Sequence, residues 1–200
     1  MRELSARGRL AGLTGALLLA AGIVLAVLPG AAAAAPANGI SLTEAMSRLT
    51  ASHNTAQQVV CSNNVYITSR ANGRIVSAEL GYSGNNYAML RARATAVGPW
   101  ERYTICTDTR SGLSSIASQA NRRIVSAELG YSGGDYAMLR ARATAVGPWE
   151  LYRIVSAGSG LAIISAANGR YVSAELGYSG SRYAMLRARA TAAGPWEQFQ

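Results

Sequence analysis

The chain has 200 residues and a formal net charge of +9, and all of its cations are arginine. This charge permits binding to acidic glycans, cell-wall phosphates, nucleic acid or an anionic membrane surface, but it specifies none of them. The sequence has a single histidine and no CxxC pair, which excludes the usual zinc sites. We therefore expect no metal and no cofactor.

Residues 1–34 have the pattern of a secretory signal peptide. Three arginines precede an apolar run over residues 10–28, and the alanine-rich tract 31–35 follows it. A cut after Ala34 satisfies the A-x-A preference. An uncleaved membrane anchor is the alternative, because the run is almost long enough to span a bilayer. The cationic start and the alanine-rich end favour cleavage, so we expect a secreted, extracellular protein that is not held in the membrane, with a mature net charge of about +7.

Residues 35–56 are predicted to be a linker that contains a short helix. Ser41 and Glu44 have the spacing of a capping box, and Leu42 and Met46 follow at helical spacing. One interpretation is an arm that binds a partner. We favour the other, a lid or linker that leads into the folded domain.

The two cysteines, Cys61 and Cys106, leave two alternatives open. An even count in an exported chain favours one disulfide, which would close a loop of 45 residues. Against this, both cysteines lie just before a repeat at roughly corresponding places, and such positions can be too far apart to bridge.

A repeated unit dominates the rest of the chain. Asn72, Asn121 and Asn168 open the three copies, and a tryptophan follows each of them 28 positions later. The segments SAELGYSG, YAMLRARATA and GPWE are identical in all copies. The repeats cover about 57–104, 105–153 and 154–200. Any surface that one copy presents is therefore expected three times.

Each repeat is predicted to be β structure. In the first copy, RIVSAEL and YAMLRARA are strand-length runs joined by the turn-forming GYSGNN, and WERYTIC is a third strand. The fourth strand is the apolar run before each asparagine, at Val65–Ser69, Leu113–Ile116 and Leu161–Ser165. Three units of four strands predict an all-β fold, the β-trefoil, in which a six-stranded barrel is capped by three hairpins. Propellers and solenoids fit less well.

The repeat also resembles a known family. The pattern V/L-x-I-x-S-x-A-N-G-R-Y/I-V-S-A-E followed by G-P-W-E is similar to fascin-like β-trefoils of secreted bacterial proteins, over roughly residues 57–200. The segment Ala167–Glu175 is the closest instance, and Arg122 replaces Gly169 in the middle copy. The resemblance implies binding to a polysaccharide or cell-wall glycan. The alternative function that the resemblance implies is that of a protein-interaction or actin-bundling module. The Q-x-W signature of ricin-type lectins is missing.

Strand alternation suggests where a sugar would bind. In YAMLRARA, Leu90 and Ala92 should face the barrel, while Tyr87 and Arg91 should face outward. An aromatic ring can lie against a pyranose, and charged groups can hydrogen-bond its hydroxyls. The predicted carbohydrate-binding residues are Glu79, Tyr82, Tyr87 and Arg91, with Glu128, Tyr131, Tyr136, Arg140, Glu175, Tyr178, Tyr183 and Arg187 as their equivalents. A plain surface network of the same side chains is the alternative interpretation.

Three further groups recur in every copy. Trp100, Trp149 and Trp196 are expected to be buried anchors, and a role as stacking platforms is the alternative. Glu101, Glu150 and Glu197 are expected to satisfy turn amides. Gly81, Gly84 and Gly98, with their equivalents, are expected at turn positions that need unusual backbone angles.

Catalysis is the hypothesis opposed to binding. Glu79 and Glu101 give two carboxylates per repeat, as a glycosidase requires. However, near-identical triplication multiplies a site without differentiating its carboxyls, and the repeats contain no histidine. We therefore predict a monomeric, non-catalytic protein that binds polysaccharide through up to three equivalent sites and has no specific nucleic-acid partner. Electrostatic adhesion to anionic polymers is a further alternative.

Overall fold

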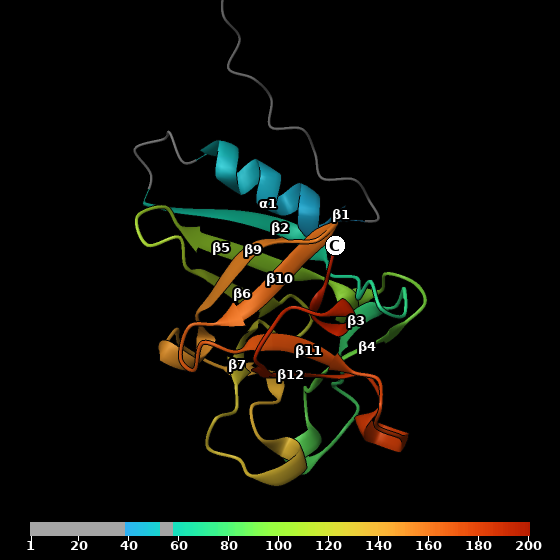
Figure 1. Cartoon of the computed structure of the whole chain (residues 1–200). Helices are drawn as coiled ribbons and strands as arrows, with labels where there is room; N and C mark the ends of the chain where they lie inside the picture. Colours follow the sequence, from blue (N-terminus) through green and yellow to red (C-terminus); the bar gives the residue numbers. More distant parts are fainter. Residues whose placement is uncertain (1–38, 53–57) are drawn as a thin grey trace, which may run out of the picture. The chain divides into compact units, whose positions relative to one another are not determined.

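The computed structural model describes residues 39–52 and 58–200 (Figure 1). The predicted signal peptide lies outside these residues, as do residues 35–38 and 53–56 of the predicted linker. Within the described ranges, no helix is long and apolar enough to cross a membrane.

The three repeats contribute corresponding strands. The first contains β2 (Val59–Tyr66), β3 (Ile75–Ala78), β4 (Leu90–Ala94) and β5 (Tyr103–Asp108). The second contains β6 (Ser114–Ser118), β7 (Arg123–Ala127), β8 (Leu139–Ala143) and β9 (Tyr152–Ala157). The third contains β10 (Gly160–Ser165), β11 (Tyr171–Glu175) and β12 (Met185–Ala190). Short 3-10 turns, η2 to η7, lie at Gly84–Asn86, Pro99–Glu101, Gly133–Asp135, Pro148–Glu150, Gly180–Arg182 and Pro195–Glu197.

The outer strands close into a barrel. β2, β5, β6, β9 and β10 follow one another as antiparallel neighbours. The segment around Phe199 supplies the sixth side, because Phe199 and Leu161 exchange backbone hydrogen bonds of 2.8 Å. On its other side, the Thr68 amide donates to the Gln200 carbonyl at 2.8 Å. Three hairpins, β3–β4, β7–β8 and β11–β12, complete the unit. The fold is the predicted all-β β-trefoil.

The hairpins meet around a pseudo-threefold axis. Single bridges pair Met89 with Arg140, Met138 with Arg187, and Met185 with Arg91. Leu90 and Ala92 face the barrel core, as strand alternation predicts. The three methionines are fully buried on the opposite side, where Tyr82, Tyr131 and Tyr178 pack against them. The cap therefore has a second small apolar cluster of its own.

Each repeat places one aromatic residue inside the barrel. Tyr103, Tyr152 and Phe199 are completely buried. The Tyr103 hydroxyl donates to the Val76 carbonyl at 3.3 Å, and burial raises the pKa of this phenol well above 10. The predicted strand WERYTIC is wrong in its first part: Trp100 and Glu101 lie in the 3-10 turn η3, and β5 begins at Tyr103. Pro99 favours this turn, because its fixed φ suits the first position of a helix.

The predicted short helix is α1 (Leu42–Ala51). The Ser41 side chain accepts a hydrogen bond from the Glu44 amide at 3.2 Å, which satisfies one free donor of the first turn. Leu42 and Leu49 are buried in the main core, and α1 lies along β2 in Figure 1. The preceding strand β1 (Ile40–Ser41) pairs in parallel with the end of β2. The helix is therefore packed against the barrel and is part of the folded unit.

Cys61 and Cys106 form a disulfide. They are direct partners on the antiparallel strands β2 and β5, with their Cα atoms 4.0 Å apart. The two positions are not related by the pseudo-threefold axis, because Cys61 lies on the first strand of its repeat and Cys106 on the fourth. This placement removes the geometric objection to the bond and ties the two ends of the first repeat together.

Candidate functional site

Glu79 is an interior residue. Its side chain is 2% exposed, and both of its oxygens accept hydrogen bonds from Arg93, with Nη2 of Arg93 lying 2.6 Å from Oε2. The hydrogen bond to Glu79, more than any other cause, raises the pKa of Arg93. The same bidentate pair recurs as Glu128 with Arg142 and Glu175 with Arg189. The carboxylate is therefore held by its own repeat and is not displayed to a ligand.

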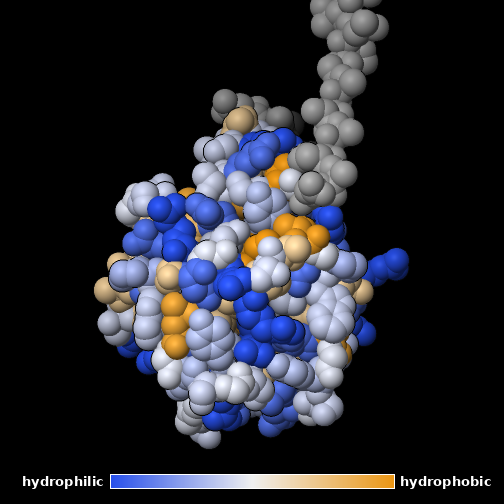
Figure 2. All heavy atoms as spheres, turned by 90° about the vertical axis from the view of Figure 1, so that its right-hand side faces the viewer, coloured by the Kyte–Doolittle hydropathy of each residue, from blue (hydrophilic) through white to orange (hydrophobic). Residues whose placement is uncertain are grey.

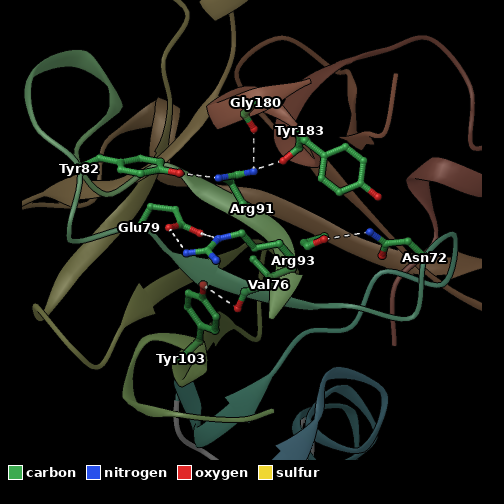
Figure 3. Close-up of polar contacts among 10 residues, drawn as sticks. Asn72, Val76, Glu79, Tyr82, Arg91, Arg93, Tyr103, Gly180 and Tyr183 are labelled. Atoms are coloured by element: carbon green, nitrogen blue, oxygen red, sulfur yellow. Dashed lines mark hydrogen bonds and ion pairs between the residues drawn. The ribbon is translucent and has the colours of Figure 1, made fainter. Parts of the chain in front are cut away.

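Arg91 is also buried, at 6% exposure, and it crosses to another repeat. Its Nε donates to the Tyr183 carbonyl at 2.8 Å, and its Nη2 donates to the Gly180 carbonyl at 3.1 Å. Its Nη1 donates to the Tyr82 hydroxyl (Figure 3). Arg140 makes the corresponding bonds to Tyr131, Tyr87 and Gly84. Arg187 makes them to Tyr178, Tyr136 and Gly133. These bonds link the three repeats in a ring around the axis.

The expectation that Arg91 faces outward is therefore wrong. The segment between β3 and β4 does not run on as an extended hairpin, because it makes the 3-10 turn η2 and then places Ala88 at a φ of 58°. This left-handed residue returns the chain, so that the Ala88 amide donates to the Glu79 carbonyl at 3.0 Å. The folded-back turn covers the outer face of β4 and buries Met89 and Arg91.

The four residues predicted in each repeat are consequently separated. Glu79 and Arg91 are interior, and Tyr82 is partly buried against the methionine cluster. Tyr87 is 38% exposed, with Tyr136 and Tyr183 at 37% and 38%. In Figure 3 the Tyr183 ring points away from the Arg91 guanidinium that its carbonyl binds. Of the predicted set, the Tyr87 position alone presents a well-exposed side chain.

The tryptophans are exposed, which corrects the expectation of buried anchors. Trp100, Trp149 and Trp196 are 38%, 38% and 40% exposed. The ring edge rests on the turn of the same repeat, because a methyl group at Gly81 would lie 3.5 Å from Cη2 of Trp100. Tyr103 takes the interior position instead. The signal available in the sequence was the aromatic residue three positions after each tryptophan, which falls on the inward face of the next strand.

The carboxylates next to the tryptophans satisfy turn amides, as predicted. Oε2 of Glu101 accepts from the Gly98 amide at 2.8 Å, and Glu150 and Glu197 repeat this contact. Gly84 has the expected positive φ, 57°. Gly98 does not, since its φ is −110°; it is required for space, because a Cβ there would lie 2.9 Å from the Glu101 carboxylate.

One face of the molecule is largely polar. Figure 2 shows strongly hydrophilic residues across the middle of one face, with hydrophobic residues confined to small separate patches. Among residues 39–52 and 58–200, no group of three or more His, Cys, Asp or Glu side chains is placed to hold a metal ion. The side chains that each repeat offers to a ligand are the exposed tryptophan, the exposed tyrosine and the Arg93-type guanidinium, whose side chain is 45% exposed.

Comparisons with known proteins place the fold. No family model matches the chain, and no curated protein matches it significantly. Among solved structures, the designed threefold-symmetric protein ThreeFoil is similar, with a TM-score of 0.56 and 15% identity over 68% of this chain and 94% of that one. The Rhizoctonia solani agglutinin has a TM-score of 0.54 and 11% identity, over 73% and 96%. A mosquitocidal holotoxin has a TM-score of 0.57 and 11% identity, but only 17% of its chain is covered.

These likenesses establish the β-trefoil fold. At such low identity they carry no ligand or activity over to this chain, because trefoil sites are made by side chains that the fold leaves free to vary.

Proposed function

We propose that the protein is a secreted, non-catalytic polysaccharide-binding protein of the fascin-like β-trefoil type that acts as a monomer with up to three equivalent sites. The observation that carries this proposal is the exposed tryptophan, present in the same setting in all three repeats. Aromatic rings left on the surface of a folded domain are a common means of holding pyranose rings.

The absence of catalysis is proposed from the state of the carboxylates. A glycosidase needs two carboxyl groups that reach the same glycosidic bond. Glu79 is enclosed and bound by Arg93, and Glu101 is 8% exposed and engaged with a turn amide. The corresponding residues of the other repeats are held in the same way. None of these six groups is placed to act on a substrate.

Secretion is proposed from the N-terminal sequence. The disulfide between Cys61 and Cys106 supports it, because such bonds persist mainly in oxidising compartments. Three weak sites on one body would also increase avidity for a polymer with repeating units.

The test is a pull-down of the purified mature chain with insoluble glucans, chitin, xylan and anionic wall polymers, at low and high salt. We expect retention on a neutral polysaccharide that persists at high salt. Retention on anionic polymers alone, lost as salt increases, would replace the proposal with electrostatic adhesion. Failure to bind any polymer would refute it.

A further inference from the structure

The exposed tryptophan does not serve the core of its repeat. Tyr103 already fills the barrel position, and the Trp100 ring lies over the turn of its repeat, where a Cβ at Gly81 would be 3.5 Å from its Cη2. Full burial of such a large side chain would stabilise the fold more than partial exposure does. The same exposure, 38% to 40%, occurs three times. The exposed part of each tryptophan ring is therefore available to contact a ligand.

A hydrogen-bond donor lies at the same end of β3. Arg93 contacts Glu79, and Trp100 lies beside Gly81. The two positions that these side chains contact are therefore only two residues apart, just after β3. Arg93 uses Nε and Nη2 for Glu79, and among the described residues its Nη1 has no hydrogen-bond acceptor. A guanidinium fixed by a bidentate bond loses little further freedom when it binds a hydroxyl. Glu79 is a positioning residue for this donor.

The donor beside each tryptophan belongs to an ion pair with no net charge. Arg93 is bound through two nitrogens to Glu79, and the same pair recurs as Arg142 with Glu128 and Arg189 with Glu175. Both Glu79 and Glu101 are close enough to Arg93 to raise its pKa. The charge of this arginine is thus already neutralised, although the chain as a whole is strongly basic. A neutral ligand suits this donor better than an anionic one.

We propose that each repeat binds a neutral pyranose unit on the exposed tryptophan, with the outward Nη1 of the Arg93-type arginine donating to a sugar hydroxyl. The three sites are Trp100 with Arg93, Trp149 with Arg142, and Trp196 with Arg189. This inference rests on the proposed polysaccharide binding and assigns its residues and ligand class.

The chain offers a direct probe, because its three tryptophans are the ones at these sites. Intrinsic fluorescence is recorded while soluble cello-, chito- and xylo-oligosaccharides, and oligogalacturonate as the anionic probe, are added to the full chain. We expect one of the neutral sugars to shift the emission in a saturable way, with the same apparent affinity at low and high salt. A response to oligogalacturonate alone would overturn the ligand class.

Variants then test the residues. The triple substitution W100A, W149A, W196A should weaken retention on the polysaccharide that holds the wild type by at least about tenfold, as truncation of an anchoring aromatic usually does. The matched control is V59A, V155A, which removes exposed apolar side chains outside the three sites and should leave retention unchanged. The triple W→F variant, which keeps a ring, should retain part of the binding and covers the case in which the alanine variant fails to fold.

The outcomes separate the two proposals. A wild type that binds none of the polymers refutes the function. A wild type that is retained while the folded tryptophan variants are retained equally well, or while the valine variant loses as much, leaves the function standing and refutes the tryptophan site.

Discussion

Replacement of Tyr103 and Tyr152 by phenylalanine should remove most of the sensitivity of this fold to alkaline pH. Both phenols are fully buried and donate to backbone carbonyls, at 3.3 and 3.2 Å. Burial raises the pKa of each well above 10, since a phenolate would lose its hydration inside the barrel. The third repeat has Phe199 at this position, so the ring alone is known to fit.

The magnitude follows from proton linkage. Above pH 10 the unfolded chain releases these two protons while the folded chain keeps them, so the free energy of unfolding falls as pH rises. The stabilisation is complete below pH 10 and is lost towards the raised folded-state pKa. Each phenol that stays protonated in the folded chain costs on the order of 1 kcal/mol between pH 9 and pH 11, and two cost about twice as much. At neutral pH the double variant should lose only about 1 to 2 kcal/mol, the contribution of two long hydrogen bonds.

Urea unfolding at pH 8, 9, 10 and 11 measures the effect, with the double variant Y103F, Y152F set against the wild type. The control is Y87F, Y136F, in which the rings are exposed and the change should leave the pH dependence of stability as it is in the wild type. The reasoning is refuted if the wild type and the Y103F, Y152F variant lose the same free energy of unfolding between pH 9 and pH 11.

Three other predictions concern stability. Replacement of Cys61 and Cys106 by serine should lower the free energy of unfolding by about 4 kcal/mol, as expected for a 45-residue loop, and denaturant titration would show a smaller change if the bond were strained or unformed. R93A should lower the free energy of unfolding by about 1 to 3 kcal/mol, because it leaves a buried carboxylate unpaired. The double change E79Q, R93Q should lower it less. Thermal unfolding in which the double variant is the less stable of the two would contradict this. E101A should lower stability by about 1 kcal/mol through loss of one turn cap, and no change in the unfolding midpoint would mean that the contact is not made in solution.

The fold was predictable because its information is periodic. The asparagine in each copy marks the register: the Asn72 side chain donates to the Ala92 carbonyl and accepts from the Arg74 amide, and the same pair of bonds closes the other two hairpins. Alternation also identified Leu90 and Ala92 as core residues. Both signals depend on local geometry, and the residues that determine this geometry recur in all three repeats.

The candidate site was less predictable because it depends on two local departures from strand geometry. Ala88 adopts a positive φ, which an alanine in a strand-like run does not signal. The resulting fold-back covers Arg91, and only the three-dimensional ring of repeats supplies its acceptors at Gly180 and Tyr183. The sequence favours a core position for the tryptophan, because Gly-Pro-Trp often precedes a strand. In the structure Pro99 begins a 3-10 turn, and the inward position falls on Tyr103.

The near-identity of the repeats has two separate causes. Segments 74–101 and 123–150 differ at only two positions, both in the hairpin turn, where Asp135 of the second copy pairs with Arg182 of the third at 2.8 Å. Buried residues such as Arg91 are hydrogen-bonded to the backbone of a neighbouring repeat, so packing couples the copies to one another.

That reason does not extend to the exposed rings. Each of the three tryptophans is 38% to 40% exposed, so more than a third of it faces solvent. Packing would tolerate a different residue there in any one repeat. Its presence in all three is therefore better explained by something outside the protein that contacts the three positions alike, and a polymer of identical sugar units has that property.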